Sequence, residues 1–282
     1  MPPTHLAPPV RLNGVSKTGG EPGPIRDQAG NGSPTRPDTP GTAPANPPAP
    51  YAAPKPSAAL EPILESAARL QQLVPNAVLV GGSAAAFHAG HRVSFDHDHT
   101  LADLRERFDQ VLEAIEEDPS FHRARVQPKK IILGRLGDIE VGIRQLRRSR
   151  PLETEQIELP SGARLTVPTL PETLRVKAYL AVTRNQVRDY LDIAALSDKI
   201  GTPEAAEVLN LIDEYYPDET ADPADQPVRT QLVTQLAAPA PSDKKTIDQL
   251  SQYKSLRPPW NKWEQVADRC LAISLAMVGK RG

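Results

Sequence analysis

The sequence is poor in cysteine and aromatic residues, and it contains no long apolar run. Its one cysteine, Cys270, excludes an internal disulfide bond, which is compatible with a reducing cytoplasm. No window approaches the roughly 20 apolar residues that a membrane-spanning helix needs. We therefore expect a cytoplasmic location and no membrane partner. The net charge of −2 argues against a surface that is basic throughout.

Proline is abundant but unevenly distributed. About half of the 31 prolines precede Ser57, together with many Gly, Ala, Ser and Thr residues. Such a segment has too few large apolar side chains to offset the entropy lost on ordering its backbone. It also has no continuous apolar core of the kind found in a secretory signal. We predict that residues 1–56 form a disordered arm rich in Pro and Gly.

The rest of the chain alternates between helical and strand patterns before it becomes helical. Helical spacing covers 58–74, 83–90 and 101–117, and strand patterns cover 77–80, 93–100, 130–133, 138–143, 156–159 and 164–167. Later helical patterns cover 171–184, 187–200, 203–216, 244–253 and 260–278. We therefore predict an α+β protein, with an α/β core of mixed β-sheet and flanking helices over 57–168 and a helical C-terminal region over 169–282.

Gly81-Gly82-Ser83 stands where a short apolar strand runs into a helix. Glycines let a ligand approach the backbone closely, and the start of a helix offers unpaired N–H groups and a positive dipole end. This arrangement suits a phosphate group, although the same three residues also occur in ordinary turns.

Asp96 and Asp98 are two residues apart on a predicted strand, so their carboxylates share one face. Adjacent carboxylates repel one another unless they share a proton or a cation, and Mg²⁺ accepts carboxylate and phosphate oxygens. An isolated pair of this kind is also typical of a solvated edge strand. A two-metal site needs a third carboxylate, for which we prefer Glu140 to Asp138 because apolar residues flank it.

These residues resemble a known family. Gly81-Gly82-Ser83 followed by His91-Arg92-x-Ser94-x-Asp96-x-Asp98 resembles the nucleotidyltransferase signature of the DNA polymerase β-like superfamily, and more narrowly its AbiEii/AbiGii toxin branch. Lys177, Arg184 and the run Arg188-Asp189-Tyr190-Leu191-Asp192 match later parts of that pattern. The resemblance covers roughly residues 60–215. Two positions depart from the pattern: His97 replaces an aliphatic residue, and Glu140 replaces an aspartate.

The resemblance implies a role for each matching residue. Gly81, Gly82 and Ser83 would cradle the phosphates of an NTP, and Lys177 would contact its triphosphate, with Arg184 and Arg188 beside it. Asp192 would belong to the catalytic set, although it could simply pair with Arg188 across one helical turn. Lys177, Arg184 and Arg188 are separated by seven and four residues, which would place them on one face of an uninterrupted helix. Such spacing is equally typical of a solvated basic face.

Four histidines near the acidic residues suggest a second kind of site, a metallohydrolase centre. They are His88, His91, His97 and His99. Strand alternation places His97 and His99 on the face opposite Asp96 and Asp98, which argues against shared metal ligation.

The segment 122–150 is strongly basic, which suggests an RNA or tRNA acceptor. It could instead be the edge of a sheet, where charged side chains prevent pairing with strands of other molecules.

Together these features predict transfer of an NMP from an NTP to RNA, protein or a small molecule, with Mg²⁺ or alternatively Mn²⁺ held by Asp96, Asp98 and Glu140. The enzyme would act as a toxin with a cognate antitoxin, or in housekeeping. The alternative is a catalytically silent nucleotide- or RNA-binding module.

Overall fold

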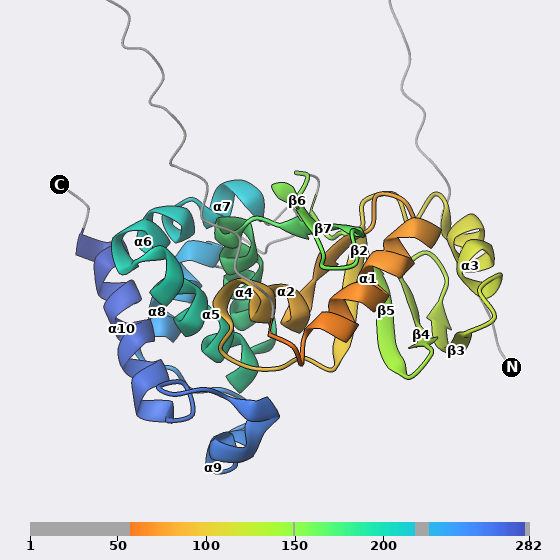
Figure 1. Cartoon of the computed structure of the whole chain (residues 1–282). Coiled ribbons are helices and arrows are strands. Elements are labelled where there is room, and N and C mark those ends of the chain that lie inside the picture. Colours follow the sequence, from red (N-terminus) through yellow and green to blue (C-terminus); the bar gives the residue numbers. More distant parts are fainter. Residues whose placement is uncertain (1–56, 149, 218–225, 280–282) are drawn as a thin grey trace, which may run out of the picture. The chain divides into compact units, whose positions relative to one another are not determined.

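A computed structural model describes residues 57–148, 150–217 and 226–279 (Figure 1). The predicted arm of residues 1–56 lies outside the described residues. All described residues belong to one compact unit, so the predicted boundary between residues 168 and 169 stays a prediction. Within the described ranges, no helix is both long and apolar enough to cross a membrane.

The first part of the described chain contains the strands. Its elements are α1 (Glu61–Leu73), β1 (Val78–Val80), α2 (Gly81–Ala89), β2 (Asp96–Leu101), α3 (Phe108–Glu116), β3 (Phe121–Gln127), β4 (Ile131–Leu136), β5 (Ile139–Gln145), β6 (Thr154–Glu158) and β7 (Arg164–Pro168). Five strands form one sheet in the order β1-β2-β5-β4-β3, in which only β2 and β5 run parallel. Strands β6 and β7 form a separate antiparallel hairpin, as the sequence predicts.

One face of the five-stranded sheet is buried under α1 and α3. Alternate strand residues Ile132, Val141 and Ile143 pack there against apolar side chains of both helices. The residues between them on β4 and β5 lie on the opposite face, where Arg135, Glu140 and Arg144 are exposed. The sheet therefore presents one apolar and one charged face. We call the charged one the open sheet face.

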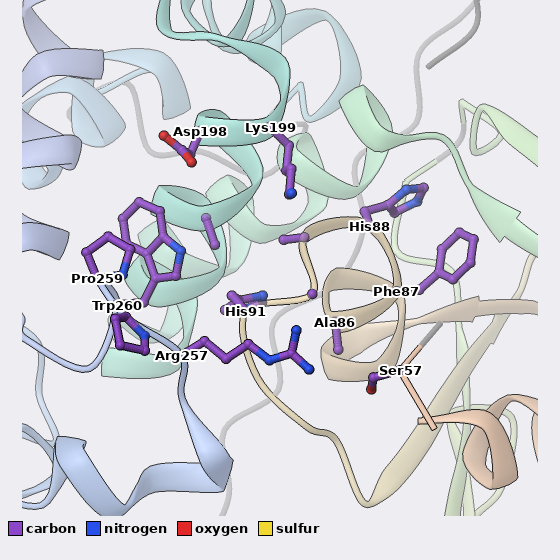
Figure 2. Close-up of a pocket in the computed structure, with 14 residues that line it drawn as sticks. Ser57, Ala86, Phe87, His88, His91, Asp198, Lys199, Arg257, Pro259 and Trp260 are labelled. Carbon is purple, nitrogen blue, oxygen red and sulfur yellow. The ribbon is translucent and has the colours of Figure 1, made fainter. Parts of the chain in front are cut away.

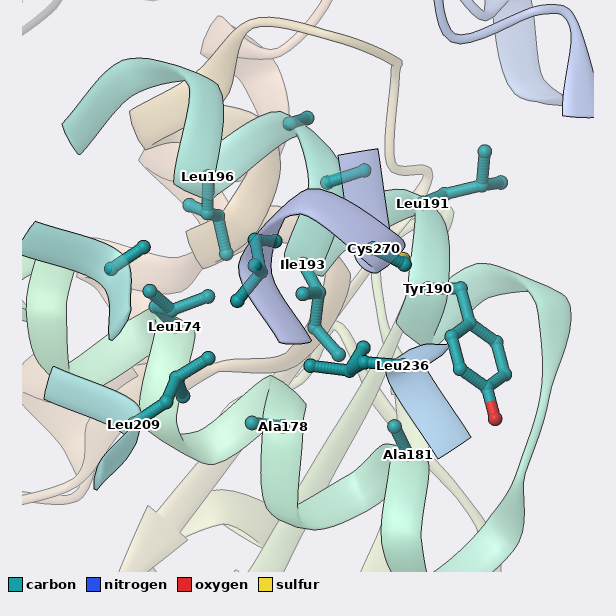
Figure 3. Close-up of a cluster of buried hydrophobic side chains, with 14 of the residues drawn as sticks. Leu174, Ala178, Ala181, Tyr190, Leu191, Ile193, Leu196, Leu209, Leu236 and Cys270 are labelled. Carbon is teal, nitrogen blue, oxygen red and sulfur yellow. The ribbon is translucent and has the colours of Figure 1, made fainter. Parts of the chain in front are cut away.

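The second part of the described chain is helical. It comprises α4 (Leu170–Arg184), α5 (Val187–Ile200), α6 (Thr202–Asn210), α7 (Ile212–Tyr215), α8 (Val228–Ala237), α9 (Lys245–Asp248), the 3₁₀-helix η1 (Leu250–Ser255) and α10 (Trp263–Gly279). Their apolar faces form a large common core, which includes Tyr190, Leu236 and Cys270 (Figure 3). The predicted α+β class, with a flanked mixed sheet and a helical C-terminal region, is confirmed.

Helix α2 joins the two parts of this arrangement. Seven of its nine residues are buried, and most are alanines that allow neighbouring elements to approach closely. Ala84 and Ala86 pack with α1 and the β6–β7 hairpin, whereas Ala85 and Ala89 pack in the helical core. The helix that starts at Gly81 is thus held on two sides.

Several predicted boundaries are wrong for identifiable reasons. Helix α1 begins at Glu61 because Pro62 occupies its first turn, while the carbonyl of Ser57 accepts N–H bonds from the preceding turn. Helix α3 begins only at Phe108, because Leu101 completes β2 beside β5. The predicted helix over 203–216 breaks into α6 and α7 at Leu211. Strand β3 and helix α8 have no counterpart in the sequence prediction.

Candidate functional site

The turn from β1 into α2 has no room for side chains. Gly81 has a positive φ of 76°, a conformation that favours glycine. A Cβ atom on Gly82 would lie 2.7 Å from the hydroxyl oxygen of Ser94 and 2.8 Å from a guanidinium nitrogen of Arg92. Glycine at both positions therefore lets the start of α2 pack closely against Arg92, Ser94 and Asp98. N–H groups in the first turn of a helix have no intrahelical partner.

Ser83 holds this turn to β2 instead of facing outward. Its side chain is fully buried, and its hydroxyl donates a hydrogen bond to the backbone carbonyl of Asp96. The hydroxyl of Ser94 in turn donates to the carboxylate of Asp96 over 2.9 Å. If Ser83 cradles a phosphate, it does so with its backbone N–H.

Asp96 and Asp98 lie on the open sheet face, as the alternation predicts. The carboxylate of Asp98 fits between two glycines: a Cβ on Gly81 would lie 3.2 Å from one of its oxygens, and a Cβ on Gly142 would lie 2.5 Å from the other. Arg144 approaches the same carboxylate at 3.6 Å. Side chains larger than glycine at these two neighbours would displace Asp98.

The strand register distinguishes the two possible third carboxylates. Asp96 and Glu140 are paired residues of the parallel strands β2 and β5, so their side chains emerge side by side on one face. Asp138 lies in the turn before β5, fully exposed and 3.1 Å from Arg135. Within the described ranges, no three His, Cys, Asp or Glu side chains are arranged to hold a metal ion. The role of Glu140 therefore stays a prediction that the register favours.

Asp192 is the centre of a buried charge cluster. Its carboxylate contacts Nε2 of His91 at 2.8 Å, the guanidinium of Arg92 at 2.8 and 3.0 Å, and Nζ of Lys177 at 2.7 Å. All four side chains are at least nine-tenths buried. The alternative pairing of Asp192 with Arg188 is wrong, because Asp192 faces Arg92 and Lys177.

The charges in the Asp192 cluster do not cancel. Burial alone would raise the pKa of Asp192, but the charges of Arg92 and Lys177 and the hydrogen bonds from His91 and Arg92 hold it well below its usual value. Burial lowers the pKa of His91, so this ring is neutral at pH 7. Two cations thus face one anion, and the guanidinium of Arg92 lies against Gly82. The excess positive charge lies behind the turn that is predicted to hold phosphate.

Lys177 does not reach the open sheet face in this structure. It is 1% exposed, and its ammonium group is bound to Asp192. Asn185 adopts a left-handed conformation that ends α4, so the helix is interrupted and Arg188 lies on α5, not on the helix of Lys177 and Arg184. Arg184 makes a bidentate ion pair with the buried Asp189, and Arg188 is exposed.

The histidines are packing residues in this structure. His97 and His99 point to the buried face of β2, as the alternation predicts, and their ring nitrogens approach within 3.5 Å. His97 also contacts the hydroxyl of Ser66, and His88 contacts the carbonyl of Pro168. Burial lowers the pKa of His88 and of His97 to about 4 and that of His99 further. None of these three rings faces Asp98, which weighs against the metallohydrolase alternative.

The basic segment contains both surface and core residues. Exposed cations are Arg123, Arg125, Lys129, Lys130, Arg135, Arg144, Arg147 and Arg150. Arg148 is instead buried, bonded to Glu172 and 5.1 Å from the ring of Tyr216. Including Arg148 in the predicted acceptor surface is therefore wrong.

Three of the exposed arginines extend from the carboxylates across the open sheet face. Arg144 follows Glu140 on β5, Arg135 is the register partner of Glu140 on β4, and Arg125 pairs with Leu133 beside it on β3. Side chains paired in this way share one face of a sheet. Cations and carboxylates thus lie on one continuous surface.

Two features of the site were not identified from the sequence. Gly142 makes room for Asp98, and an isolated glycine inside an apolar strand is a recognisable signal of close approach. His91 and Arg92 appear in the matching pattern, but their partner Asp192 is about 100 residues away in the chain. Only the folded structure shows that pairing.

No family model matches the chain. Among solved structures, MenT4, a nucleotidyltransferase toxin of Mycobacterium tuberculosis H37Rv, is 19% identical, with a TM-score of 0.50 over 76% of this chain and 82% of that one. The chain has the nucleotidyltransferase fold. An antigenic nucleotidyltransferase-like protein of Paracoccidioides brasiliensis is 18% identical, with a TM-score of 0.44 over 73% of this chain and 96% of its own.

Curated relatives of this nucleotidyltransferase-fold chain carry different names. The heme uptake protein MmpL11 of Mycobacterium tuberculosis H37Rv is 33% identical over 247 residues, which cover 79% of this chain and 23% of the relative. The mycolic acid-containing lipids exporter MmpL11 of Mycolicibacterium smegmatis is 40% identical over 131 residues, covering 46% of this chain and 13% of the exporter. The chain spans about a quarter or less of these relatives.

Proposed function

We propose that the chain is a Mg²⁺-dependent nucleotidyltransferase. An acceptor oxygen attacks the α-phosphorus of an NTP, a new P–O bond forms, and the bond to the β,γ-pyrophosphate breaks. The observation that carries this proposal is the position of Asp98 on the open sheet face, between Gly81 at the start of α2 and Gly142 on β5. Carboxylates that would hold a metal ion therefore adjoin a backbone that would hold phosphate.

Carboxylates are the kind of donor that Mg²⁺ accepts together with substrate phosphate oxygens. Asp96 and Asp98 offer two carboxylates on one face, and in this proposal Glu140, the register partner of Asp96, adds a third. When bound, Mg²⁺ or Mn²⁺ would neutralise negative charge on the phosphates. Glu140 would also take the proton of the acceptor hydroxyl, because it is the exposed carboxylate of this set.

The phosphates would be held by the start of α2 and the Asp192 cluster behind it. The backbone N–H groups of Gly82 and Ser83 belong to the first turn of α2 and would donate hydrogen bonds to phosphate oxygens. The positive end of the helix dipole also favours anions there. Arg92 and Lys177 together carry one positive charge more than Asp192 neutralises. This charge would attract the phosphates, because the protein interior screens charge less than water does. In this proposal Lys177 acts on the triphosphate through that cluster and not by direct contact.

The acceptor that the surface fits best is RNA, including tRNA. Arg125, Arg135 and Arg144 form a row that leads to the carboxylates, as a phosphate backbone would require. The fold shared with MenT4 motivates a further proposal, that the chain acts as a toxin restrained by an antitoxin, within the AbiEii-like branch.

A catalytically silent nucleotide-binding module is the second candidate. It is favoured by the buried position of Lys177 and by the absence, within the described ranges, of a metal-holding group of three ligands. Binding of an NTP without pyrophosphate release would be its sign.

The deciding experiment incubates the protein with each α-labelled NTP, Mg²⁺ and total RNA. We expect one NTP to give labelled RNA and released pyrophosphate. The double variant Asp96→Asn/Asp98→Asn should remain folded and lose both products. Product formation by that variant, or binding of NTPs by the wild type with no pyrophosphate released, would contradict the proposed catalysis.

A further inference from the structure

A cavity lies at the opposite end of α2 from the predicted phosphate site. It has a volume of about 490 Å³ and is bounded by the C-terminal ends of α2 and α5 and by the segment from Arg257 to Trp260 (Figure 2). Gly81 and Ala89 are separated by about 12 Å along the helix axis, given the rise per residue of an α-helix. The cavity is therefore distinct from the open sheet face.

Two cations enter this cavity from different elements. Lys199, in the last turn of α5, and Arg257, in the segment before α10, both extend toward its centre in Figure 2. In the part of the chain that the structure describes, neither side chain makes an ion pair or a side-chain hydrogen bond. Asp198 is the carboxylate of the lining, and it is already paired with Arg269. Among the described residues, neither cation has a carboxylate within ion-pair distance, and both side chains are exposed.

The walls give the cavity a defined shape. Ala86, Ala89 and Gly90 contribute almost no side-chain volume, and the indole of Trp260 closes the opposite side (Figure 2). His91 is 2% exposed and also lines the cavity. Its Nε2 atom contacts Asp192, whereas its Nδ1 atom has no hydrogen-bond partner in the described structure. A buried polar atom without a hydrogen-bond partner is uncommon in folded proteins.

We propose that this cavity is a second anion site, which binds a phosphate group through Lys199 and Arg257. The phosphate is either free or part of a small phosphate ester. A guanidinium offers a fork of donors that matches phosphate oxygens, and an ammonium group adds a point charge. The neutral His91 ring leaves an acceptor at Nδ1 that a hydroxyl group of an ester could satisfy after a small movement of the wall.

A different role for the two cations makes a different prediction. The C-terminal ends of α2 and α5 carry partial negative charge, and cations stabilise such ends without any ligand. In that case Lys199 and Arg257 would affect thermal stability and would not bind phosphate. The two roles are separated by measuring ligand binding and unfolding on the same variants.

Trp260 provides the readout, because the chain contains only one other tryptophan, Trp263. In a full-length Trp263→Phe protein, titration with inorganic phosphate, ribose 5-phosphate and chloride at equal ionic strength should change the fluorescence of Trp260 only with the phosphates. Tighter binding of ribose 5-phosphate than of inorganic phosphate would identify an ester as the ligand, and equal binding would identify free phosphate.

The double variant Lys199→Gln/Arg257→Gln should weaken phosphate binding at least tenfold. The control Arg105→Gln/Lys244→Gln removes the same charge from two exposed residues outside the cavity and should bind normally. Binding should also persist in Asp98→Asn, which separates this site from the proposed catalytic one. A saturating response that survives in the double variant, or no saturating response in the wild-type background, would overturn the proposal.

Discussion

The open sheet face and the Asp192 cluster both contain carboxylates and basic side chains, but these are buried in the cluster and partly or fully exposed on the open face. On the open face, Asp98 is about one-third exposed and has a single arginine at 3.6 Å. In the cluster, Asp192 is fully buried and satisfied by Arg92, Lys177 and His91. Removing one partner of a buried ion pair leaves a buried charge uncompensated, whereas a charge at the surface stays solvated and is available to a ligand. Substitutions in the two regions should therefore have different consequences.

The largest effect on stability is expected for Asp192→Asn. This change leaves Arg92 and Lys177 buried without a counter-charge, which typically costs about 3–5 kcal/mol. Urea denaturation would measure the loss. The matched change on the open face, Glu140→Gln, should stay within about 0.5 kcal/mol of the wild type. Equal and small losses in both variants would remove the distinction between the two regions.

The buried histidines predict a dependence of stability on pH. The folded pKa values of His88 and His97 are about 4, below the 6.5 of an unfolded histidine. The unfolded state then binds more protons between these values, so stability is full above pH 6.5 and falls toward pH 4, by about 3 kcal/mol per histidine. Denaturation at several pH values should show that the free energy of unfolding falls as the pH is lowered. The fall should be smaller in His97→Asn. An unchanged slope in His97→Asn would refute the assignment.

Removing the arginine row should weaken RNA binding without unfolding the protein. Arg125→Gln/Arg135→Gln/Arg144→Gln should bind tRNA about 30-fold more weakly, roughly 2 kcal/mol. The slope of log Kd against log salt should also decrease, because fewer counterions are released. The triple control Arg105→Gln/Lys244→Gln/Lys245→Gln changes the same charge at exposed positions elsewhere. If both variants lost affinity equally, only net charge would matter.

A smaller effect is expected for Gly142→Ala. The added Cβ would lie 2.5 Å from an oxygen of Asp98, so this carboxylate must move. We expect nucleotide transfer to fall about tenfold, equivalent to roughly 1.4 kcal/mol, with only a minor change in melting temperature. Gly279→Ala is the control, since nothing lies within 4 Å of its added Cβ. Full activity of Gly142→Ala would show that Asp98 needs no fixed position.

The sequence predicts the local and periodic features well. The bounds of α5 are those predicted, and the shared face of Asp96 and Asp98 follows from strand alternation alone. Strand β3 was not predicted because most of its residues are exposed at the edge of the sheet. Its sequence therefore lacks the alternation of apolar and polar residues that indicates a strand. The AbiEii-like branch and the roles of the site residues stay predictions.

Long-range pairing could not be predicted from one sequence. Lys177 and Arg148 read as surface cations, and both are buried because Asp192 and Glu172 meet them in the folded chain. Nothing in their local pattern distinguishes them from Arg144, which stays exposed. The register that brings Glu140 beside Asp96 is likewise a property of the sheet and not of either strand.

The most direct test of the account is metal binding by the open sheet face. Electron paramagnetic resonance of Mn²⁺ would be recorded for the full-length protein with a non-hydrolysable NTP analogue. The account predicts bound Mn²⁺ in the wild type and in Lys199→Gln, and its loss in Asp96→Asn/Asp98→Asn with melting temperature unchanged. Bound Mn²⁺ that survives in the double variant would contradict the assignment of Asp96 and Asp98 as the metal ligands.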